Sequence, residues 1–233
     1  MNRHLVIGSR GEVGSAVLAL VSEVFDAMGL DLNEPAPVGK FDVLHVCIPW
    51  SDKFVGIVQD YQEKYGAPGA LTIIHATVPV GTSDQCKGVH SPTRGVHPYL
   101  LKGLKSFVKY CGGKRANEAA AIFSALGLSA HIVCSARDTE ALKLWDTSGY
   151  GLNIILEKAI WQYCQENALD FNTVYTHANW TYNEGFKRMG MESNSKYVLE
   201  HMDGPIGGHC VLPNCDLLGG TIAEFIKAEA SKQ

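Results

Sequence analysis

Short apolar runs alternate with amphipathic stretches in the first part of the chain. Three runs are nearly continuous in apolar residues, as parallel strands covered on both faces are: His4–Ile7, Phe41–Pro49 and Leu71–His75. Between them, Ser15–Met28 and Lys53–Tyr65 repeat apolar positions at the spacing of one helix face. This order of strands and helices predicts an α/β domain with a doubly wound, mostly parallel sheet.

The pattern continues more weakly to about residue 136. We expect three further strands around Lys87–His90, Val108–Cys111 and Ala130–Cys134, and a helix near Asn117–Leu126. Residues 29–40 contain two prolines and two glycines, which predicts mostly loop with at most a short second strand at Leu30–Leu32.

A helical half follows. Asp138 is a suitable N-cap, and the spacing predicts one long helix from there to Asn167, with further helices over Asp170–Ala178, Glu184–Met189 and Leu217–Ala230. The long helix carries one apolar stripe, made of Leu152, Ile155, Leu156, Ala159, Ile160 and Tyr163. We therefore expect a Rossmann-type domain over 1–136 and an all-α domain over 137–233 built on one long central helix. The stripe suits a core or a two-fold pairing of helices, and we expect a homodimer.

Composition narrows the class of protein. Hydrophobic residues make up 46% of the chain and charged residues 19%, as in an ordinary globular protein. A net charge of −4 argues against nucleic-acid binding, which needs a basic face. No apolar run is long enough to span a membrane, and no signal peptide is recognisable. The seven cysteines are an odd number without regular spacing, so we expect reduced thiols, a cytoplasmic protein and no metal site.

A glycine turn lies between the first strand and the first helix, where it predicts a phosphate-binding Rossmann site. Its residues are Gly8, Ser9, Arg10, Gly11, Glu12, Val13 and Gly14. The spacing is GxxGxxG, so Ser9 takes the usual first-glycine position when Gly11 and Gly14 are aligned with GxGxxG. Asp31, with Glu34 as the other candidate, is the acidic residue expected to bind the ribose. We expect NAD as cofactor; NADP stays possible, because Arg10 suits a 2′-phosphate.

Three further segments together carry a resemblance. They are TVPVGT at 77–82, TEALKL at 139–144 and GPIGGHCVLP at 204–213. In this order and spacing, the chain resembles the UDP-glucose/GDP-mannose dehydrogenase family, especially its UDP-N-acetyl-hexosamine branch, over roughly residues 4–218. The resemblance implies an NAD-dependent enzyme that oxidises a primary alcohol to a carboxylate, and a long helix at a dimer interface.

The resemblance also implies roles for single residues. Cys210 would be the covalent nucleophile, Lys143 would stabilise the oxyanion, Thr77 would orient a water or hydroxyl, and Asn214 would assist Cys210. Pro49 and Thr77 would line the cofactor, and the substrate would meet Ser91, Thr147 and His209. Arg94 and His97 belong to a polar, rigid segment after a probable strand end, where α/β sheets bind ligands, and there we expect Arg94 to bind an anionic group and His97 to act as an acid or base. A thiolate in a glycine-rich loop beside a histidine is also a chemically reasonable nucleophile, and a lysine stabilises an oxyanion.

The chain departs from the family at several points. Thr147 stands where the family has an asparagine, Asn214 where it has an aspartate, and Thr93 where it has a glutamate. The sequence given ends soon after the cysteine segment, so we expect a shortened chain without the family's C-terminal UDP-binding domain. Two alternatives stay open: a Rossmann-like protein that binds another adenine ligand, such as an S-adenosylmethionine-dependent transferase, and a non-catalytic sensor or partner subunit.

Overall fold

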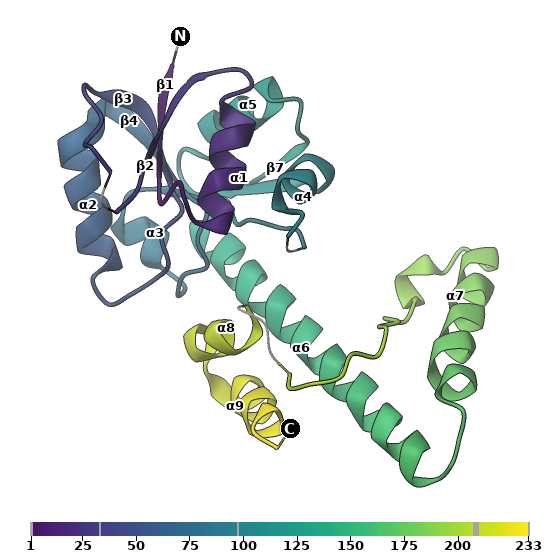
Figure 1. The fold of residues 1–233 in the computed structure, drawn as a ribbon. Coiled ribbons are helices and arrows are strands. Elements are labelled where there is room, and N and C mark those ends of the chain that lie inside the picture. The colour runs from purple at the N-terminus through teal and green to yellow at the C-terminus, as the bar shows by residue number, and fades with distance from the viewer. Residues whose placement is uncertain (1, 33, 97, 207–209, 233) are drawn as a thin grey trace. The chain divides into compact units, whose positions relative to one another are not determined.

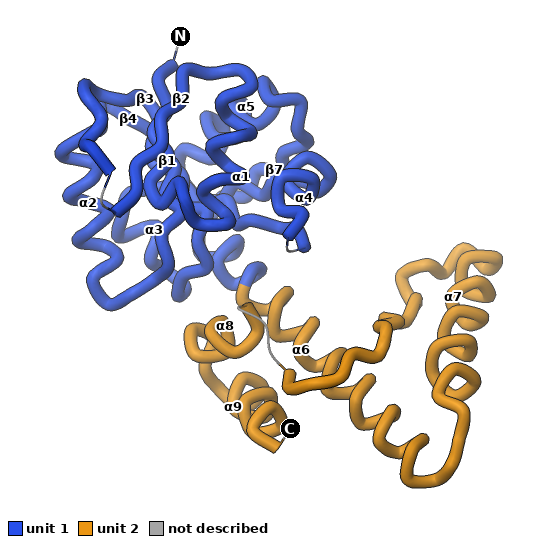
Figure 2. Tube along the Cα trace, in the orientation of Figure 1, with its two compact units in different colours: residues 1–143 blue, residues 144–233 orange. Residues whose placement is uncertain are grey.

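The computed structural model describes all residues except 1, 33, 97, 207–209 and 233. The chain divides into two compact units, residues 1–143 (unit 1) and residues 144–233 (unit 2), as Figure 2 shows. The boundary falls within α6 (Ala136–Glu166), so the first turns of this helix belong to unit 1.

Unit 1 is built on a seven-stranded sheet with the order β2-β1-β3-β4-β5-β6-β7. Neighbouring strands are parallel except β5 and β6, where the direction reverses. The strands are β1 (Arg3–Ile7), β2 (Asp26–Leu30), β3 (Phe41–Val46), β4 (Gly66–Ile74), β5 (Val89–His90), β6 (Lys109–Gly112) and β7 (Ala130–Val133). The expected Rossmann-type, mostly parallel α/β fold is confirmed.

Helices cover both faces of this sheet (Figure 1). One apolar layer joins it to α1 (Glu12–Val21), α4 (Leu100–Ser106) and α5 (Ala116–Ala125). The opposite layer joins it to α2 (Phe54–Tyr65) and to Val78 and Cys86, which lie on either side of the short α3 (Thr82–Gln85). Burial on both faces explains why β1 and β3 read as nearly unbroken apolar runs.

The region around the second strand differs from the expectation. The predicted helix Ser15–Met28 is too long, because α1 ends at Val21 and residues 26–30 form β2, a full strand parallel to β1. The strand was hidden because β2 lies at the sheet edge and buries only Leu30 fully. Gly29 is required there, since a Cβ at this position would lie 2.7 Å from Ser9 Oγ.

Unit 2 consists of helices, as expected. After α6 come the π-helix η1 (Asn172–His177), α7 (Ala178–Arg188), the short η2 (Glu192–Asn194), α8 (Val211–Leu218) and α9 (Gly220–Ala230). The predicted single helix Leu217–Ala230 is wrong, because Gly219 and Gly220 both have positive φ and separate α8 from α9. Within the described ranges, no helix has both the length and the apolarity needed to cross a bilayer.

Three buried histidines form a hydrogen-bonded chain through the core of unit 1. His4 Nδ1 lies 2.9 Å from His45 Nε2, and His45 Nδ1 lies 3.0 Å from His75 Nε2. Successive rings are stacked, with centroids 5.2 and 5.3 Å apart. Burial lowers the pKa of His45 and His75 well below the usual range, and that of His4 to about 4. All three imidazole rings are therefore neutral at pH 7.

Candidate functional site

The glycine turn has the geometry of a phosphate-binding loop. Gly8 takes a positive φ of 82° directly after β1, and its amide donates to the carbonyl oxygen of Leu30 at 2.8 Å. A Cβ on Gly14 would overlap the Gly8 carbonyl, so α1 approaches the turn closely only because Gly14 has none. Gly11 is the exposed N-cap of α1, and a Cβ there would meet only the Gly8 oxygen, at 3.4 Å. The turn thus leaves open space at the start of the helix, where a phosphate can approach backbone amides.

This geometry corrects the alignment from spacing. The residue with the left-handed backbone is Gly8, so Gly8 makes the tight turn that the first glycine of GxGxxG makes. Ser9 is buried and packs against Gly29 of β2. The extra residue between Gly8 and Gly11 is accommodated within the turn.

Asp31 lies where a Rossmann fold presents the ribose-binding acid, directly after β2. Its Oδ2 accepts a hydrogen bond from the Arg10 amide at 2.7 Å, and its Oδ1 accepts one from Leu32. The exposed Arg10 side chain forms an ion pair with Glu34 at 2.5 Å. Asp31 and Glu34 therefore both lie beside the turn. The guanidinium of Arg10, which could bind a 2′-phosphate, is already paired with Glu34.

The other predicted residues of unit 1 follow the carboxyl ends of adjacent strands. Pro49 follows β3 and is exposed, while Thr77 follows β4 and is half-buried. Ser91 follows β5 and is buried. The carboxyl ends of parallel strands meet at one edge of the sheet, which also carries the glycine turn after β1. The fold thus gathers these predicted residues along one edge.

Lys143, the last residue of unit 1, belongs to α6 and is half-buried. It lies close enough to His90 for its charge to help lower the pKa of that histidine to about 3, although burial is the main cause. His90 Nδ1 lies 2.9 Å from Thr139 Oγ1, and its Nε2 lies 3.1 Å from the Ala76 carbonyl oxygen. His90 thus links the start of α6 to the ends of β4 and β5.

Glu140 fixes the loop that contains Thr77. Its buried carboxylate accepts hydrogen bonds from the Gly81 amide at 2.5 Å and the Ser83 amide at 2.7 Å, at the start of α3. Burial raises the pKa of Glu140, and these two amides oppose the rise. The position of the TVPVGT segment relative to α6 therefore depends on a residue that spacing did not single out.

The segment after β5 carries the predicted substrate residues. Its Arg94 guanidinium lies over the rings of Phe107, 5.8 Å from the centroid, and Tyr110, at 5.5 Å. Arg94 is half-buried and available as a cation at this edge. His97 lies outside the described residues.

In unit 2, Cys210 is half-buried and forms the N-cap of α8. Asn214 is buried one turn later, and its backbone N–H donates to the Cys210 carbonyl oxygen at 3.2 Å. On α6, Thr147 is buried one turn before Gly151, where the missing Cβ lets Val211 of α8 pack closely. Unit 2 thus places Cys210 and Asn214 on one helix, with Thr147 on the face of α6 that packs against it. His209 lies outside the described residues.

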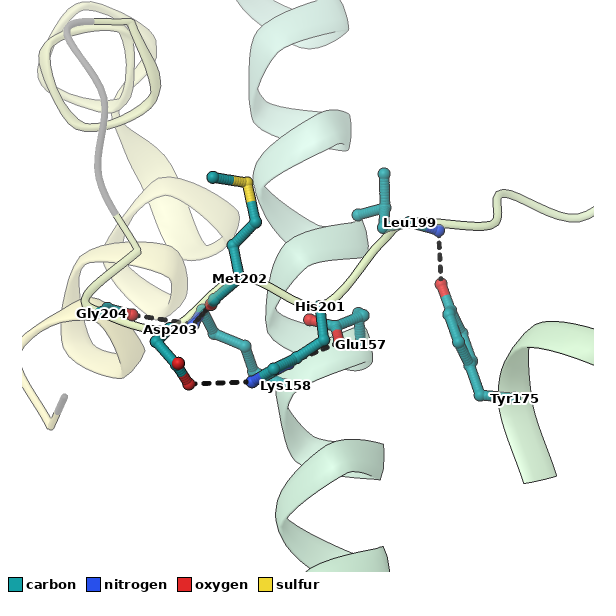
Figure 3. Close-up of polar contacts among 8 residues, drawn as sticks. All are labelled: Glu157, Lys158, Tyr175, Leu199, His201, Met202, Asp203 and Gly204. Carbon is teal, nitrogen blue, oxygen red and sulfur yellow. Dashed lines mark hydrogen bonds and ion pairs between the residues drawn. The ribbon is translucent and has the colours of Figure 1, made fainter. Parts of the chain in front are cut away.

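The segment that leads toward Cys210 is tied to α6 and η1 (Figure 3). Buried Glu157 accepts a hydrogen bond from His201 Nδ1 at 2.8 Å, and the His201 ring stacks on Trp161. Lys158 Nζ donates to the carbonyl oxygens of Met202 and Gly204, each at 2.7 Å. The Tyr175 hydroxyl accepts from the Leu199 amide at 3.2 Å. These contacts anchor the chain on the approach to the candidate nucleophile.

Glu140, His90 and Glu157 were missed because each is a polar residue whose partners come from other elements. One cavity of about 490 Å³ in unit 1 is lined by residues such as Asp42, Gly69 and Arg115, and none of its lining residues is a predicted site residue. Among the described residues, no three His, Cys, Asp or Glu side chains group as a metal ion requires.

Proteins of known structure share the fold of this chain. The sequence matches no protein-family model and no curated protein. Solved structures are similar along the whole chain. The UDP-D-ManNAc dehydrogenase of Pyrococcus horikoshii has a TM-score of 0.79 at 16% identity, covering 99% of this chain and 68% of that one.

Two further solved structures are similar to this chain, one from a longer protein and one from a protein of nearly the same length. The UDP-N-acetyl-mannosamine dehydrogenase of S. aureus has a TM-score of 0.68 at 17% identity, covering 98% of this chain and 68% of that one. The 3-hydroxyisobutyrate dehydrogenase of Mycobacterium tuberculosis has a TM-score of 0.70 at 13% identity, covering 100% of this chain and 93% of that one. From end to end, the chain therefore has the fold that nucleotide-sugar and hydroxyacid dehydrogenases share.

Proposed function

We propose that the protein is an NAD-dependent dehydrogenase that oxidises an alcohol group of a sugar or nucleotide sugar. The observation that carries this proposal is the glycine turn, with Gly8 in the left-handed region, open space at Gly11 and Asp31 after β2. The pyrophosphate would lie at the start of α1 beside Glu12 and Val13, and the adenosine ribose would lie at Asp31. When bound there, the nicotinamide would accept a hydride from the alcohol carbon.

The charges around the turn favour NAD over NADP. A 2′-phosphate would meet the carboxylates of Asp31 and Glu34, and the Arg10 guanidinium is paired with Glu34. The negative charges of these carboxylates oppose the binding of a phosphate, whereas a ribose 2′-hydroxyl donates readily to a carboxylate.

Several observations support a polar, oxygen-rich substrate. Dehydrogenases of UDP-sugars are among the structural neighbours, and the resemblance of the motifs leads to the same class. Arg94 offers a cation for an anionic group of the substrate. The chain spans only about two-thirds of those enzymes, so we also include smaller hydroxyacids, as oxidised by neighbours of similar length.

For the chemistry we propose Cys210 as nucleophile. Its thiolate would add to the carbonyl carbon of an aldehyde, and Lys143 would stabilise the negative oxygen that forms. A second NAD molecule would accept the hydride of the resulting thiohemiacetal, which would leave a thioester on Cys210. A water molecule oriented by Thr77 would then hydrolyse this thioester to the carboxylate and the free Cys210 thiolate. Asn214 would hold the loop of Cys210, and Thr147 would face the substrate.

We also propose a homodimer formed through α6. The apolar stripe of this helix is divided: Leu152 and Ile155 pack against the core of α8 and α9, whereas Leu156 and Tyr163 are 56% and 58% exposed. Exposed apolar side chains repeating along one helix face are typical of an interface. We place the enzyme in the cytoplasm, because its cysteine content fits a reducing compartment.

Titration with NADH tests the cofactor. We expect saturable fluorescence enhancement, and a thermal shift with NAD that exceeds the shifts with NADP and S-adenosylmethionine, since only a ligand of the native state raises the melting temperature. Absence of binding at millimolar NADH would overturn the proposal. A larger shift with S-adenosylmethionine would assign the site to a transferase.

Activity assays test the chemistry. The panel is UDP-N-acetyl-mannosamine, UDP-glucose and 3-hydroxyisobutyrate with NAD, and we expect NADH formation with one of the two UDP-sugars. Cys210→Ala should abolish carboxylate formation and retain NADH affinity, whereas Cys134→Ala, which changes an exposed thiol, should have no effect. NADH binding without turnover, together with a Cys210 that iodoacetamide labels no faster than Cys134, would instead support a sensor.

A further inference from the structure

Lys109 is a lysine in the interior of unit 1. It is the first residue of β6, and only 2% of its surface is exposed. Because β6 runs antiparallel to β5, with His90 opposite Gly112, the beginning of β6 lies beside the residues that follow β5. The reversal of one strand therefore brings Lys109 to the edge of the sheet where the candidate site lies.

The Lys109 ammonium is bound to the backbone of the predicted substrate segment. Its Nζ donates to the Ser91 carbonyl oxygen at 3.1 Å and to the Pro92 carbonyl oxygen at 3.0 Å. It also lies over the Phe123 ring, 5.1 Å from the centroid. Among the described residues, no carboxylate forms an ion pair with Lys109. Its positive charge is therefore directed to two peptide carbonyls.

The charge of Lys109 is costly in this place. Burial lowers the pKa of Lys109 to about 8, which shows that the charged form is disfavoured there. The groups that face it are Cys47, His45, His75, His90, Arg94, Cys111 and Lys143. They include two cations, no carboxylate, and thiols whose pKa is raised by burial. A buried cation in such surroundings needs an explanation other than packing.

The segment that Lys109 holds is also shaped from its other side. A Cβ on Gly103 of α4 would lie 2.7 Å from Gly95 Cα and 3.2 Å from the Arg94 carbonyl oxygen, so α4 approaches this backbone closely. The buried Thr93 hydroxyl makes no hydrogen bond to any described residue. The segment is thus fixed on two sides and carries a polar group left for another partner.

We propose that Lys109 is a positioning residue for substrate binding: its ammonium group fixes the carbonyls of Ser91 and Pro92, and thereby sets the place of Thr93 and Arg94 at the site. This inference rests on the proposed function for the identity of the site. The hydrogen bonds that Lys109 makes are independent of the proposed function.

Amide hydrogen exchange on the whole protein tests the positioning directly. In Lys109→Met, we expect the amides of Thr93 to Val96 to exchange roughly tenfold faster, because two charge-assisted hydrogen bonds are lost. Exchange in β1 and β3 should stay unchanged. Lys109→Arg should restore part of the protection, and Lys102→Met, which removes an exposed lysine of α4, should have no effect. Unchanged exchange at Thr93 to Val96 in Lys109→Met would overturn the inference.

Two further measurements separate positioning from simple stability. Wild-type protection of Thr93 to Val96, corrected for the intrinsic exchange rate, should fall as the pH rises through about 8, and the Met variant should show no such step. NADH affinity should be equal in the wild type and in Lys109→Met. In the variant, KM for the UDP-sugar substrate should rise at least fivefold with kcat nearly unchanged. Failure of NADH to bind the wild type would overturn the proposed function and leave the exchange result to judge Lys109. A Met variant that loses NADH affinity and global protection together would overturn the positioning role.

Discussion

At the scale of single residues, the three glycines of the turn have three different physical tasks. Gly8 supplies a backbone conformation, Gly14 permits close packing of α1 on the turn, and Gly11 leaves space above the helix N-terminus. Only the last of these tasks concerns a ligand. Substitutions should therefore separate folding from cofactor binding within one heptapeptide.

Gly14→Ala and Gly11→Ala form a matched pair. We expect Gly14→Ala to destabilise the fold by about 2–4 kcal/mol, because its Cβ would overlap backbone. Gly11→Ala should lower the free energy of unfolding by at most about 1 kcal/mol, because alanine is a poorer N-cap than glycine, and should weaken NADH binding at least roughly tenfold. Urea denaturation and NADH titration measure the two effects. Equal stability of the two variants would contradict this assignment.

Lys109 makes the stability of the protein depend on pH. Its pKa is about 8 in the folded chain and 10.5 ordinarily, so between these values the unfolded chain binds more protons. The free energy of unfolding should therefore rise with pH in the wild type relative to Lys109→Met, by up to about 3 kcal/mol between pH 7 and 10.5. Urea denaturation of both proteins at several pH values measures the difference. Parallel pH profiles would contradict the shift.

At the scale of elements, the sequence predicted those whose pattern reflects burial on two faces. The strands β1, β3 and β4 and the long α6 were recognisable because apolar residues run unbroken or repeat at helical spacing. The edge strand β2, the break at Gly219 and the short α3 and α4 were not. These depend on neighbours in space: β2 on its pairing with β1, and α3 on capping by Glu140.

The candidate site was predictable to the same extent. The glycine turn and Asp31 follow from local order along the chain, because a strand, a turn and a helix place them. Lys109 and His90 have roles only through the reversed strand β6 and the start of α6. No spacing in the sequence indicates that β6 is antiparallel to β5.

α6 acts as a support for the segment before Cys210, which leads to a prediction. Lys158→Met removes two hydrogen bonds, to Met202 and Gly204. We expect the amides of Met202 to Gly204 and of Ile206 to exchange several times faster, with a loss of stability of at most about 1 kcal/mol because the contacts are exposed. Hydrogen exchange with mass spectrometry measures this, and Lys187→Met on α7 is the control. Equal exchange in both variants would show that the segment is held otherwise.

At the scale of the whole molecule, the fold is shared by enzymes of two lengths. The chain covers 68% of the UDP-D-ManNAc dehydrogenase and 93% of the 3-hydroxyisobutyrate dehydrogenase. What they have in common with this chain is a Rossmann-type, mostly parallel sheet followed by helices. The apolar side chains that α6 leaves exposed are the feature of unit 2 with a consequence for assembly.

Leu156→Glu tests that consequence. A charge in the middle of an apolar helix interface is strongly unfavourable, so we expect the variant to elute as a monomer where the wild type is a dimer. Light scattering coupled to size-exclusion chromatography measures the mass of each. Val174→Glu changes a side chain of similar exposure (45%) outside α6 and should leave the dimer intact. A wild-type monomer would refute the proposed dimer.

The histidine chain of unit 1 has a consequence for the whole sheet. Each of its two hydrogen bonds needs one N–H and one lone pair, and all three rings are neutral. The tautomers of His4, His45 and His75 are therefore not independent: all three carry their proton on Nδ1, or all three carry it on Nε2. A change at one ring must be followed by the other two, so β1, β3 and the end of β4 share a single choice between two proton arrangements. Nitrogen NMR shifts of the three imidazoles should report one common tautomer.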